Sequence, residues 1–221
     1  VPAIFYHMEQ AGLNAIPIIA LIAFLIGLVI AYQGAIQLRQ FGAEIFVVDM
    51  VAVSVLRELA ILLTAIVVAG RSGSAFTAQI GAMKINEEVD AMRTIGLDPM
   101  QVLVLPRLIA LMIVLPLLGF VADVMGLVGG GVMSMIELGI SPSQYIDRLE
   151  QSFAPWSLGT GLLKAPVFAA IIALTSCHMG MKVSGSSESL GKFTTRSVVH
   201  AIFAVIVVDA MFSIFFAYIG I

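Results

Sequence analysis

Five long stretches with almost no charged residues run through this sequence. A helix needs roughly 20 apolar residues to cross a hydrocarbon core about 30 Å thick, and each stretch is long enough to do so. The sequence therefore predicts an all-α integral membrane protein whose five membrane-spanning helices form a single domain over residues 1–221. The predicted spans cover residues 14–37, 45–70, 104–136, 152–181 and 197–220.

The composition agrees with membrane insertion and excludes several classes of function. Hydrophobic residues make up 60% of the chain and charged residues 11%, a balance outside the range of water-soluble domains. The formal net charge of -3 leaves no basic patch, so we expect no nucleic-acid binding. One cysteine and three scattered histidines do not supply the spacing of a metal site or a disulfide framework, so we predict neither.

The distribution of Lys and Arg predicts the orientation of the chain, because cytoplasmic loops of membrane proteins carry an excess of positive charge. The first and third connections hold only Arg39 and Arg148. The second and fourth connections and their flanks hold seven basic residues: Arg71, Lys84, Arg93, Arg107, Lys182, Lys192 and Arg196. We therefore place these two connections and the N-terminus in the cytoplasm, and the C-terminus on the other side. Because the chain begins with Val1, we expect an upstream segment to be missing.

The connection between the second and third predicted spans has a helical pattern of its own. Its apolar residues recur at helical spacing and its charged residues occupy the opposite faces. This pattern predicts an amphipathic helix over about residues 75–95, lying along the cytoplasmic membrane surface. A plain interfacial helix is the alternative, but such a helix would be rich in Lys and Arg. The polar face is largely acidic, which favours a protein partner, and its central charges are Glu87, Glu88, Asp90 and Arg93.

Charged side chains inside the predicted spans are candidates for a functional site, because an ionisable group at bilayer depth costs several kcal/mol unless it is paired or hydrated. The main candidates are Arg57, Glu58, Lys164 and Asp209. Neighbouring helix positions point about 100° apart, so we expect Arg57 and Glu58 not to satisfy each other fully. Lys164 and Asp209 have opposite signs near the middle of their spans, which favours a cross-helix pair. Asp49 falls near the outer interface, where water can hydrate it.

Two interpretations of these buried charges remain open. They form internal salt bridges that fix the register of the helices, or they line a pathway through the membrane. A proton relay ranks last, because His178 and His200 fall at the cytoplasmic ends of their spans. The GxxxG pair of Gly126 and Gly130 is equally open, since it fits close helix packing within one chain or at a seam between two copies.

We predict no catalytic residues, because the sequence contains no pattern typical of nucleophilic, metal-dependent or dinucleotide chemistry. Residues 185–192 come nearest to a nucleotide-binding loop. Five residues separate the two glycines, one more than that loop has, and no Ser or Thr follows Lys192. We therefore predict no cofactor in this chain, and any ATP that powers it must be bound by another chain.

Several blocks of this sequence are longer and more specific than general membrane-helix patterns. They are Leu56-Arg57-Glu58-Leu59, AGRSGSA at residues 69–75, Ala78-Gln79-Ile80-Gly81 with Met83, Glu87-Glu88 with Asp90-Ala91-Met92, Gly96, Asp98-Pro99, and later residues 161–168, 194–199 and Asp209. These blocks resemble the MlaE family of ABC-transporter permeases. The likeness runs from about Ile16 to the C-terminus.

The resemblance implies a homodimeric permease in the bacterial inner membrane, with a cytoplasmic N-terminus and a periplasmic C-terminus. Such a permease moves phospholipid between the inner membrane and a periplasmic MCE-domain protein, which maintains the lipid asymmetry of the outer membrane. Two cytoplasmic ABC ATPase subunits would bind the ATP and Mg²⁺. A STAS-domain protein or a fused STAS domain often accompanies them. Shorter family members begin with an amphipathic elbow helix, of which residues 1–10 would be the tail, and longer members carry a STAS-like domain in the same chain.

The resemblance also implies roles for the candidate residues. The amphipathic segment over about residues 75–95 matches the family's coupling helix, which docks into the ATPase. Polar positions that the family places in or near a lipid cavity at the dimer interface are matched by Arg57, Glu58 and Lys164. A membrane-embedded acidic position of the last helix is matched by Asp209.

Two other functions remain as alternatives. An ion-coupled secondary carrier would work without an ATPase, but five spans without a visible inverted repeat disfavour it. A non-transporting membrane scaffold would bind partner proteins and hold no lipid between its copies. Stable association with an ATPase would exclude the first alternative, and bound phospholipid would argue against the second.

Overall fold

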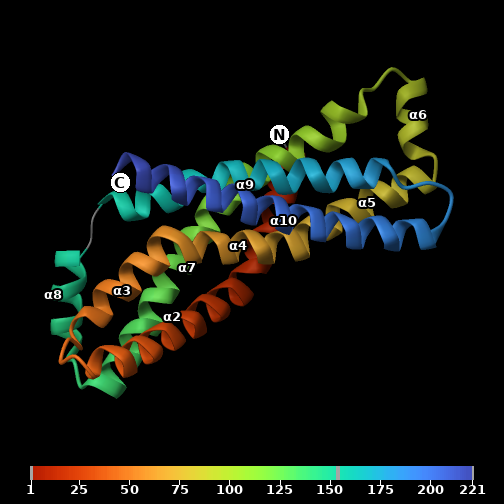
Figure 1. Cartoon of the computed structure of the whole chain (residues 1–221). Coiled ribbons are helices and arrows are strands. Elements are labelled where there is room, and N and C mark those ends of the chain that lie inside the picture. The colour runs from red at the N-terminus through yellow and green to blue at the C-terminus, as the bar shows by residue number, and fades with distance from the viewer. Residues whose placement is uncertain (1, 153–154, 221) are drawn as a thin grey trace. The chain divides into compact units, whose positions relative to one another are not determined.

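The computed structural model describes residues 2–152 and 155–220, in which every regular element is a helix (Figure 1). The described residues contain five helical segments long and apolar enough to cross a membrane. They are Pro2–Arg39, Phe46–Ile85, Met100–Leu138, Leu158–Met181 and Ser187–Ile219. The prediction of an all-α integral membrane protein with five spans is therefore confirmed. Residues 153 and 154, at the start of the fourth predicted span, lie outside the described residues.

The second span is interrupted by turns of π-helix. It consists of α3 (Phe46–Ser54), α4 (Ala60–Val68) and α5 (Ser74–Ile85), joined by π-helical turns at Val55–Leu59 and Ala69–Gly73. A third such turn, Met100–Val104, precedes α7 (Leu105–Leu138). Single π-helical turns are rare and occur often at functional sites. The first two coincide with blocks that carry the family resemblance, and the first contains both Arg57 and Glu58.

The connection between the second and third spans contains a break that the sequence pattern does not reveal. One continuous helix over about residues 75–95 was expected, and in this respect the prediction is wrong. The chain forms α5, which continues the second span, and then a separate helix α6 (Glu88–Thr94). Between them Glu87 has a φ of 60°, a left-handed conformation that ends a helix. The spacing of buried apolar residues nevertheless continues across the break, since Val89, at the start of α6, is also buried.

Contacts divide the chain into two compact units. Unit 1 comprises Val1–Ala15, Ala65–Pro116 and Ala165–Phe212, and unit 2 comprises Ile16–Thr64, Leu117–Lys164 and Ser213–Ile221. The described parts of α4, α7, α9 (Pro155–Met181) and α10 (Ser187–Ile219) each contribute residues to both units. A division of this kind is not visible in the sequence, because it cuts the membrane helices rather than the loops.

In unit 2 the backbones of two membrane helices approach closely. A Cβ added at Gly27, on α2 (Ile16–Arg39), would overlap the carbonyl oxygen of Gly126 on α7. Gly126 and Gly130 also face the side chains of Val55 and Val51. Small residues allow such close packing of membrane helices. The GxxxG pair therefore packs helices within one chain, which was one of the two interpretations left open.

Unit 2 also contains a helix that the sequence analysis missed. The third connection forms α8 (Pro142–Ser152), which packs against α3. Tyr145 of α8 is buried and donates a hydrogen bond to the carbonyl oxygen of Leu127 at 2.9 Å, and burial raises the pKa of its phenol to about 12. Arg148 and Ser152 of α8 both bond to the carboxylate of Asp49, which is therefore paired and not simply hydrated. Proline at the first helical position was a signal for this helix.

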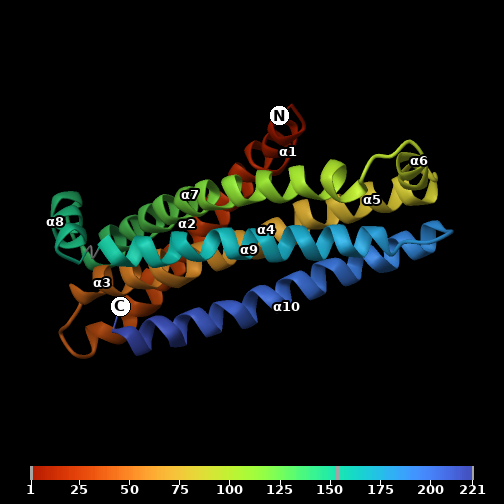
Figure 2. The ribbon, with the colours of Figure 1, turned by 90° about the horizontal axis from the view of Figure 1, so that it is seen from above.

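In unit 1 a threonine joins three helices. Thr77 of α5 donates to the carbonyl oxygen of Ser176 on α9 at 3.0 Å and bonds to the hydroxyl of Ser197 on α10 at 2.8 Å. Both Thr77 and Ser197 are fully buried. In this unit α9 and α10 run side by side (Figure 2). Because hydrogen bonds in an apolar interior are not weakened by water, this junction couples α5 to both helices.

A second polar cluster of unit 1 lies under the N-terminal helix α1 (Pro2–Ala11). His7 of α1 packs edge-on against Phe76 with ring centroids 5.6 Å apart. Arg107 lies over the same ring and donates to the carbonyl oxygen of Leu103 at 2.7 Å and to Gln79 at 3.2 Å. Arg107 is buried, although the charge pattern places it among the loop-flanking basic residues. It satisfies a carbonyl of the π-helical turn that precedes α7.

Candidate functional sites

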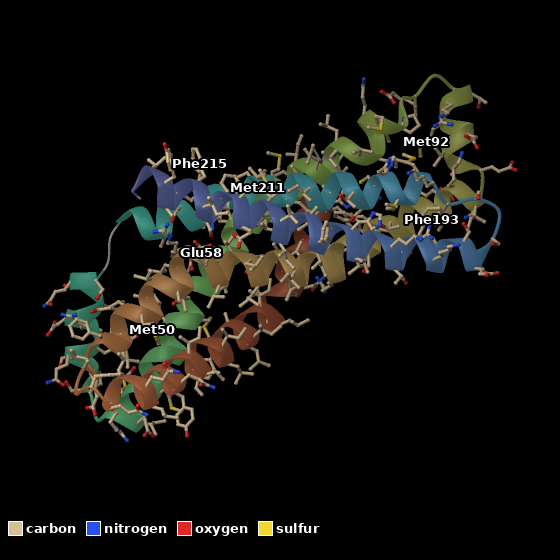
Figure 3. The ribbon with its side chains drawn as sticks, in the orientation of Figure 1. Met50, Glu58, Met92, Phe193, Met211 and Phe215 are labelled. Carbon is tan, nitrogen blue, oxygen red and sulfur yellow. The ribbon has the colours of Figure 1, made fainter. Side chains whose placement is uncertain are left out.

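The first candidate site is a charged cluster centred on Glu58, which lies on the π-helical turn between α3 and α4 (Figure 3). The Nζ atom of Lys164, on α9, lies 2.5 Å from Oε2 of Glu58. The side chain of Lys164 is 0% exposed, whereas that of Glu58 is 30% exposed. The cluster thus has a buried cation and a carboxylate that remains partly accessible.

Further groups bind the carboxylate of Glu58 through hydrogen bonds and a second ion pair. The hydroxyl of Ser213, on α10, donates to Oε2 of Glu58 at 2.7 Å. The Nε atom of Arg57 lies 3.4 Å from Oε1, a long contact for a charged pair. Lys164 also donates to the backbone carbonyl of Arg57 at 3.4 Å. The expectation that Arg57 and Glu58 do not fully satisfy each other agrees with these additional partners.

Close packing explains how Lys164 reaches the cluster. A Cβ added at Gly161 would overlap the carbonyl oxygen of Leu56, so only glycine permits this approach of α9 to the π-helical turn. Lys164 follows Gly161 by three positions and therefore extends from the same face of α9. The turn itself is widened, because the N–H of Ala60 donates to the carbonyl of Val55 five positions earlier.

The structure thus brings together three of the four predicted residues, Arg57, Glu58 and Lys164. The fourth, Asp209, is buried on α10 and belongs to unit 1. The Lys164–Asp209 pair stays a prediction. The pairing of Lys164 with Glu58 was missed, because the sequence does not show which buried charges face each other. Ser213 was missed because an isolated hydroxyl in an apolar span carries no distinctive signal.

Asp123 is a further buried carboxylate that the sequence analysis did not select. It lies on α7, is 4% exposed, and its Oδ1 has no hydrogen-bond partner among the described residues. Gly119, one turn earlier, faces Ile61 and Leu162, and Gly126, one turn later, faces Val55. Asp123 therefore lies on the side of α7 that faces the π-helical turn. The sequence alone could have singled out Asp123, since it is the one charged residue within residues 108–136.

The second candidate site is the surface of α6, and we call Glu87, Glu88, Asp90, Arg93 and Ile95 together the α6 surface. All of its members are exposed, whereas Val89 beside them is fully buried and anchors the helix. Ile95 is 72% exposed. The α6 surface therefore presents charged groups of both signs and one apolar side chain to the solvent.

Ion pairs hold the α6 surface in place. Lys84, at the end of α5, lies 3.0 Å from the carboxylate of Asp90, and Arg93 lies 3.1 Å from it. The hydrogen bond from Lys84 is the main reason that the pKa of Asp90 is below its usual value. The Lys84–Asp90 pair joins the separate helix α6 to the end of α5, and the Arg93–Asp90 pair lies within α6. Glu87 and Glu88 remain at the exposed bend between the two helices.

No group of three His, Cys, Asp or Glu side chains in the described part of the chain is arranged to hold a metal ion. The two candidate sites consist of charged pairs and hydrogen-bonded groups. Such groups can bind and orient a polar ligand group or a protein partner.

A comparison with protein families matches residues 4–215 to a family model described as Permease MlaE. A probable ABC transporter permease protein of Rickettsia prowazekii is 34% identical over 190 residues, which is 86% of this chain and 73% of that protein. The intermembrane phospholipid transport system permease protein MlaE of Haemophilus influenzae is 33% identical over 210 residues, or 94% of this chain and 80% of that protein. The chloroplastic protein Trigalactosyldiacylglycerol 1 of Arabidopsis thaliana is 31% identical over 210 residues, and the matched region covers 95% of this chain but 60% of that protein.

Proposed function

Because the chain belongs to the MlaE permease family, we propose that this multi-pass membrane permease is the membrane subunit of an ATP-driven lipid transporter. The proposed cargo is phospholipid, which moves between the bacterial inner membrane and a periplasmic MCE-domain partner. The name of the Haemophilus influenzae relative, a permease of an intermembrane phospholipid transport system, supports this cargo. Two copies of the chain would work with two cytoplasmic ABC ATPase subunits, and a STAS-domain protein or domain completes the proposed assembly.

The α6 surface is the single observation that carries this proposal. It is exposed, lies between candidate spans, and presents acidic residues beside an apolar one. The candidate span Phe46–Ile85 leads directly into it, because α5 continues the second span. A partner that binds α6 therefore acts on the end of a membrane helix. This arrangement suits a coupling element better than a surface helix attached by a slack loop.

Contacts within unit 1 supply a route for the coupling. Movement of α6 reaches α5 through the Lys84–Asp90 ion pair and through the packing of the two helices against each other. From α5 it reaches α9 and α10 through the hydrogen bonds of Thr77 to Ser176 and Ser197. In the proposed mechanism, closure of the ATPases on bound ATP and Mg²⁺ presses on α6, and these contacts shift the helices together.

The Glu58 cluster is the proposed place for a polar lipid head group. Acyl chains require apolar walls, which the membrane helices supply, and a head group requires charge or hydrogen bonds. Glu58 and Arg57 are partly exposed and are the proposed contacts, whereas buried Lys164 positions Glu58. Asp209 is proposed as an acidic group of the same pathway. The proposed orientation, with a cytoplasmic N-terminus and a periplasmic C-terminus, is supported by the distribution of Lys and Arg along the sequence.

The docking role of the α6 surface is tested by reversing charge on it. The double variant E87K/E88K, co-expressed with the ATPase, should retain about tenfold less ATPase in a pull-down, because like charges at an interface cost several kcal/mol. The matched control is D147K/E150K, which makes the same change of charge on exposed positions of α8. Equal recovery of the ATPase with both variants would refute docking at α6.

The lipid cargo is tested separately by native mass spectrometry of the purified complex. Phospholipid bound to two copies of the chain is the expected result. A complex that contains the ATPase but no lipid would favour a membrane scaffold, and a functional chain that never associates with an ATPase would favour an ion-coupled carrier.

A further inference from the structure

A groove between α9 and α10 lies within unit 1 and is separate from both candidate sites. Its volume is about 730 Å³. Met179, Val199 and Phe203 form apolar parts of its lining, and His178, Lys182 and His200 contribute polar groups. We call this cavity the α9–α10 groove. It is large enough for a head group together with part of an acyl chain.

The charge of the α9–α10 groove has one sign. Lys182 supplies a positive charge, and the imidazoles of His178 and His200 can each donate an N–H. Among its lining residues, all of them in the described part of the chain, none is Asp or Glu. A phosphate group, with oxygen acceptors and negative charge, complements this set.

A neighbouring cavity of unit 1 shows that this complementarity is specific to the groove. It has a volume of about 630 Å³ and shares Thr175 and His178 with the α9–α10 groove. Its lining, however, includes both Arg93 and Asp98. Charges of both signs offer an anion little net attraction. Electrostatics therefore distinguishes two cavities of similar size that share part of α9.

The charged end of the groove and its exposed aromatic ring lie at different positions along the helices. Lys182 follows the last residue of α9, and His200 lies nearer the start of α10 than Phe203 does. Phe203 is 69% exposed, so its ring is available to an acyl chain. With the fourth connection in the cytoplasm, the basic groups lie toward the membrane surface and Phe203 lies deeper. Basic pockets between membrane helices on the cytoplasmic side commonly bind anionic lipid head groups.

We propose that the α9–α10 groove binds an anionic phospholipid of the cytoplasmic leaflet, with its phosphate at Lys182 and His200 and an acyl chain along Phe203. The inference rests on the proposed orientation of the chain. It does not depend on which lipid is transported or on docking of the ATPase. The lipid at this site is a bound ligand of α9 and α10 and not cargo at the Glu58 cluster.

The test is binding of phosphatidylglycerol and phosphatidylcholine, with the same acyl chains, to the purified full chain in detergent, followed by native mass spectrometry. The wild-type protein should prefer phosphatidylglycerol. The variant K182Q/H200Q should lose this preference, by about fivefold for the lysine alone, since a basic residue near the membrane surface contributes about that much to anionic-lipid binding. His178 is left unchanged because it lines both cavities.

The matched control is K192Q, which removes a lysine of the same connection that does not line the groove. It should keep the wild-type preference, and an equal loss in K192Q would overturn the proposal in favour of nonspecific attraction. The single variant K182Q repeats the test if the double variant does not fold, as judged by its melting temperature.

Two other occupants are outcomes of the same experiment. If K182Q/H200Q changes the oligomeric state and leaves lipid preference unchanged, the groove is an interface between copies and the proposal fails. If glycerol phosphate without acyl chains displaces phosphatidylglycerol completely, the site recognises a free anion and the lipid assignment fails. Because the purified chain is tested alone, either failure is distinguishable from a failure of ATPase docking.

Discussion

The Glu58 cluster and the α6 surface contain the same chemical groups in different surroundings. In the first, a carboxylate pairs with Lys164, whose side chain is 0% exposed. In the second, Asp90 pairs with Lys84 and Arg93, and the side chain of Asp90 is 51% exposed. The N–O distances are 2.5 Å in the first pair and 3.0 and 3.1 Å in the second set.

This difference in burial separates a role in stability from a role in recognition. A buried charge that loses its partner cannot be hydrated, so breaking the pair is costly. An exposed charge is hydrated and screened whether or not it is paired, so its pair contributes little to folding. We therefore expect the Glu58 cluster to stabilise the fold and the α6 surface to affect partner binding. Four predictions test this contrast.

The largest expected effect comes from removing the carboxylate that pairs with the buried cation. E58Q takes the negative charge away from Lys164, whose side chain is 0% exposed, and should lower the free energy of unfolding by about 3 kcal/mol. Unfolding of the purified protein in detergent, followed by circular dichroism, measures this change. The double variant E58Q/K164M removes both charges and should recover most of the loss. Wild-type unfolding of E58Q would show that the pair does not stabilise the fold.

An intermediate effect is expected where the ion pair is partly buried. Arg148 and Asp49, which join α8 to α3, each have a side chain that is 26% exposed. R148M should lower the free energy of unfolding by about 2 kcal/mol, the usual value for hydrogen bonds to charged groups. The matched control is R39M, because Arg39 pairs with Glu44 and Glu137 but is 51% exposed. A larger loss in R39M than in R148M would contradict the dependence on burial.

For a variant of the α6 surface, the free energy of unfolding should barely change, whereas binding of the ATPase should weaken. D90N removes the carboxylate that joins α6 to Lys84 of α5 and that accepts a hydrogen bond from Arg93 within α6. Because Asp90 is exposed, the unfolding transition should match that of the wild type. Recovery of the ATPase in a pull-down should nevertheless fall, because α6 is no longer held in one orientation. If D90N clearly lowered the free energy of unfolding, the α6 surface would stabilise the fold as the Glu58 cluster does, and the contrast between the two sites would be wrong.

The smallest effect concerns the titration of Asp90 itself. Its pKa in the folded protein is lowered from 3.8, chiefly by the hydrogen bond from Lys84. A lowered pKa means that the ion pair contributes at neutral pH and that its contribution is lost as the pH falls through the folded-state value. Carbon-13 NMR of labelled aspartate should give a midpoint below 3.8, and K84M should raise it. An unchanged midpoint in K84M would show that Lys84 does not hold this carboxylate.

The residues of the α6 surface were predictable, but its shape was not. The helical spacing of apolar residues correctly marks Val89 as an inward position and Glu87, Glu88, Asp90 and Arg93 as outward ones. The left-handed backbone conformation of Glu87 cannot be recognised from that spacing. Position 87 is also neither glycine nor asparagine, which are the usual signals of such a conformation.

The sequence by itself determined the helical class, the five spans and the charged residues within them, because the cost of placing polar groups in hydrocarbon acts on each residue locally. Only the tertiary structure decided that Glu58 receives Lys164 and Ser213, that α8 folds onto α3, and that Gly27 lies against Gly126. These contacts join residues about a hundred positions apart in several cases. They depend on which faces of the helices meet, and hydropathy along the chain contains no information about that choice.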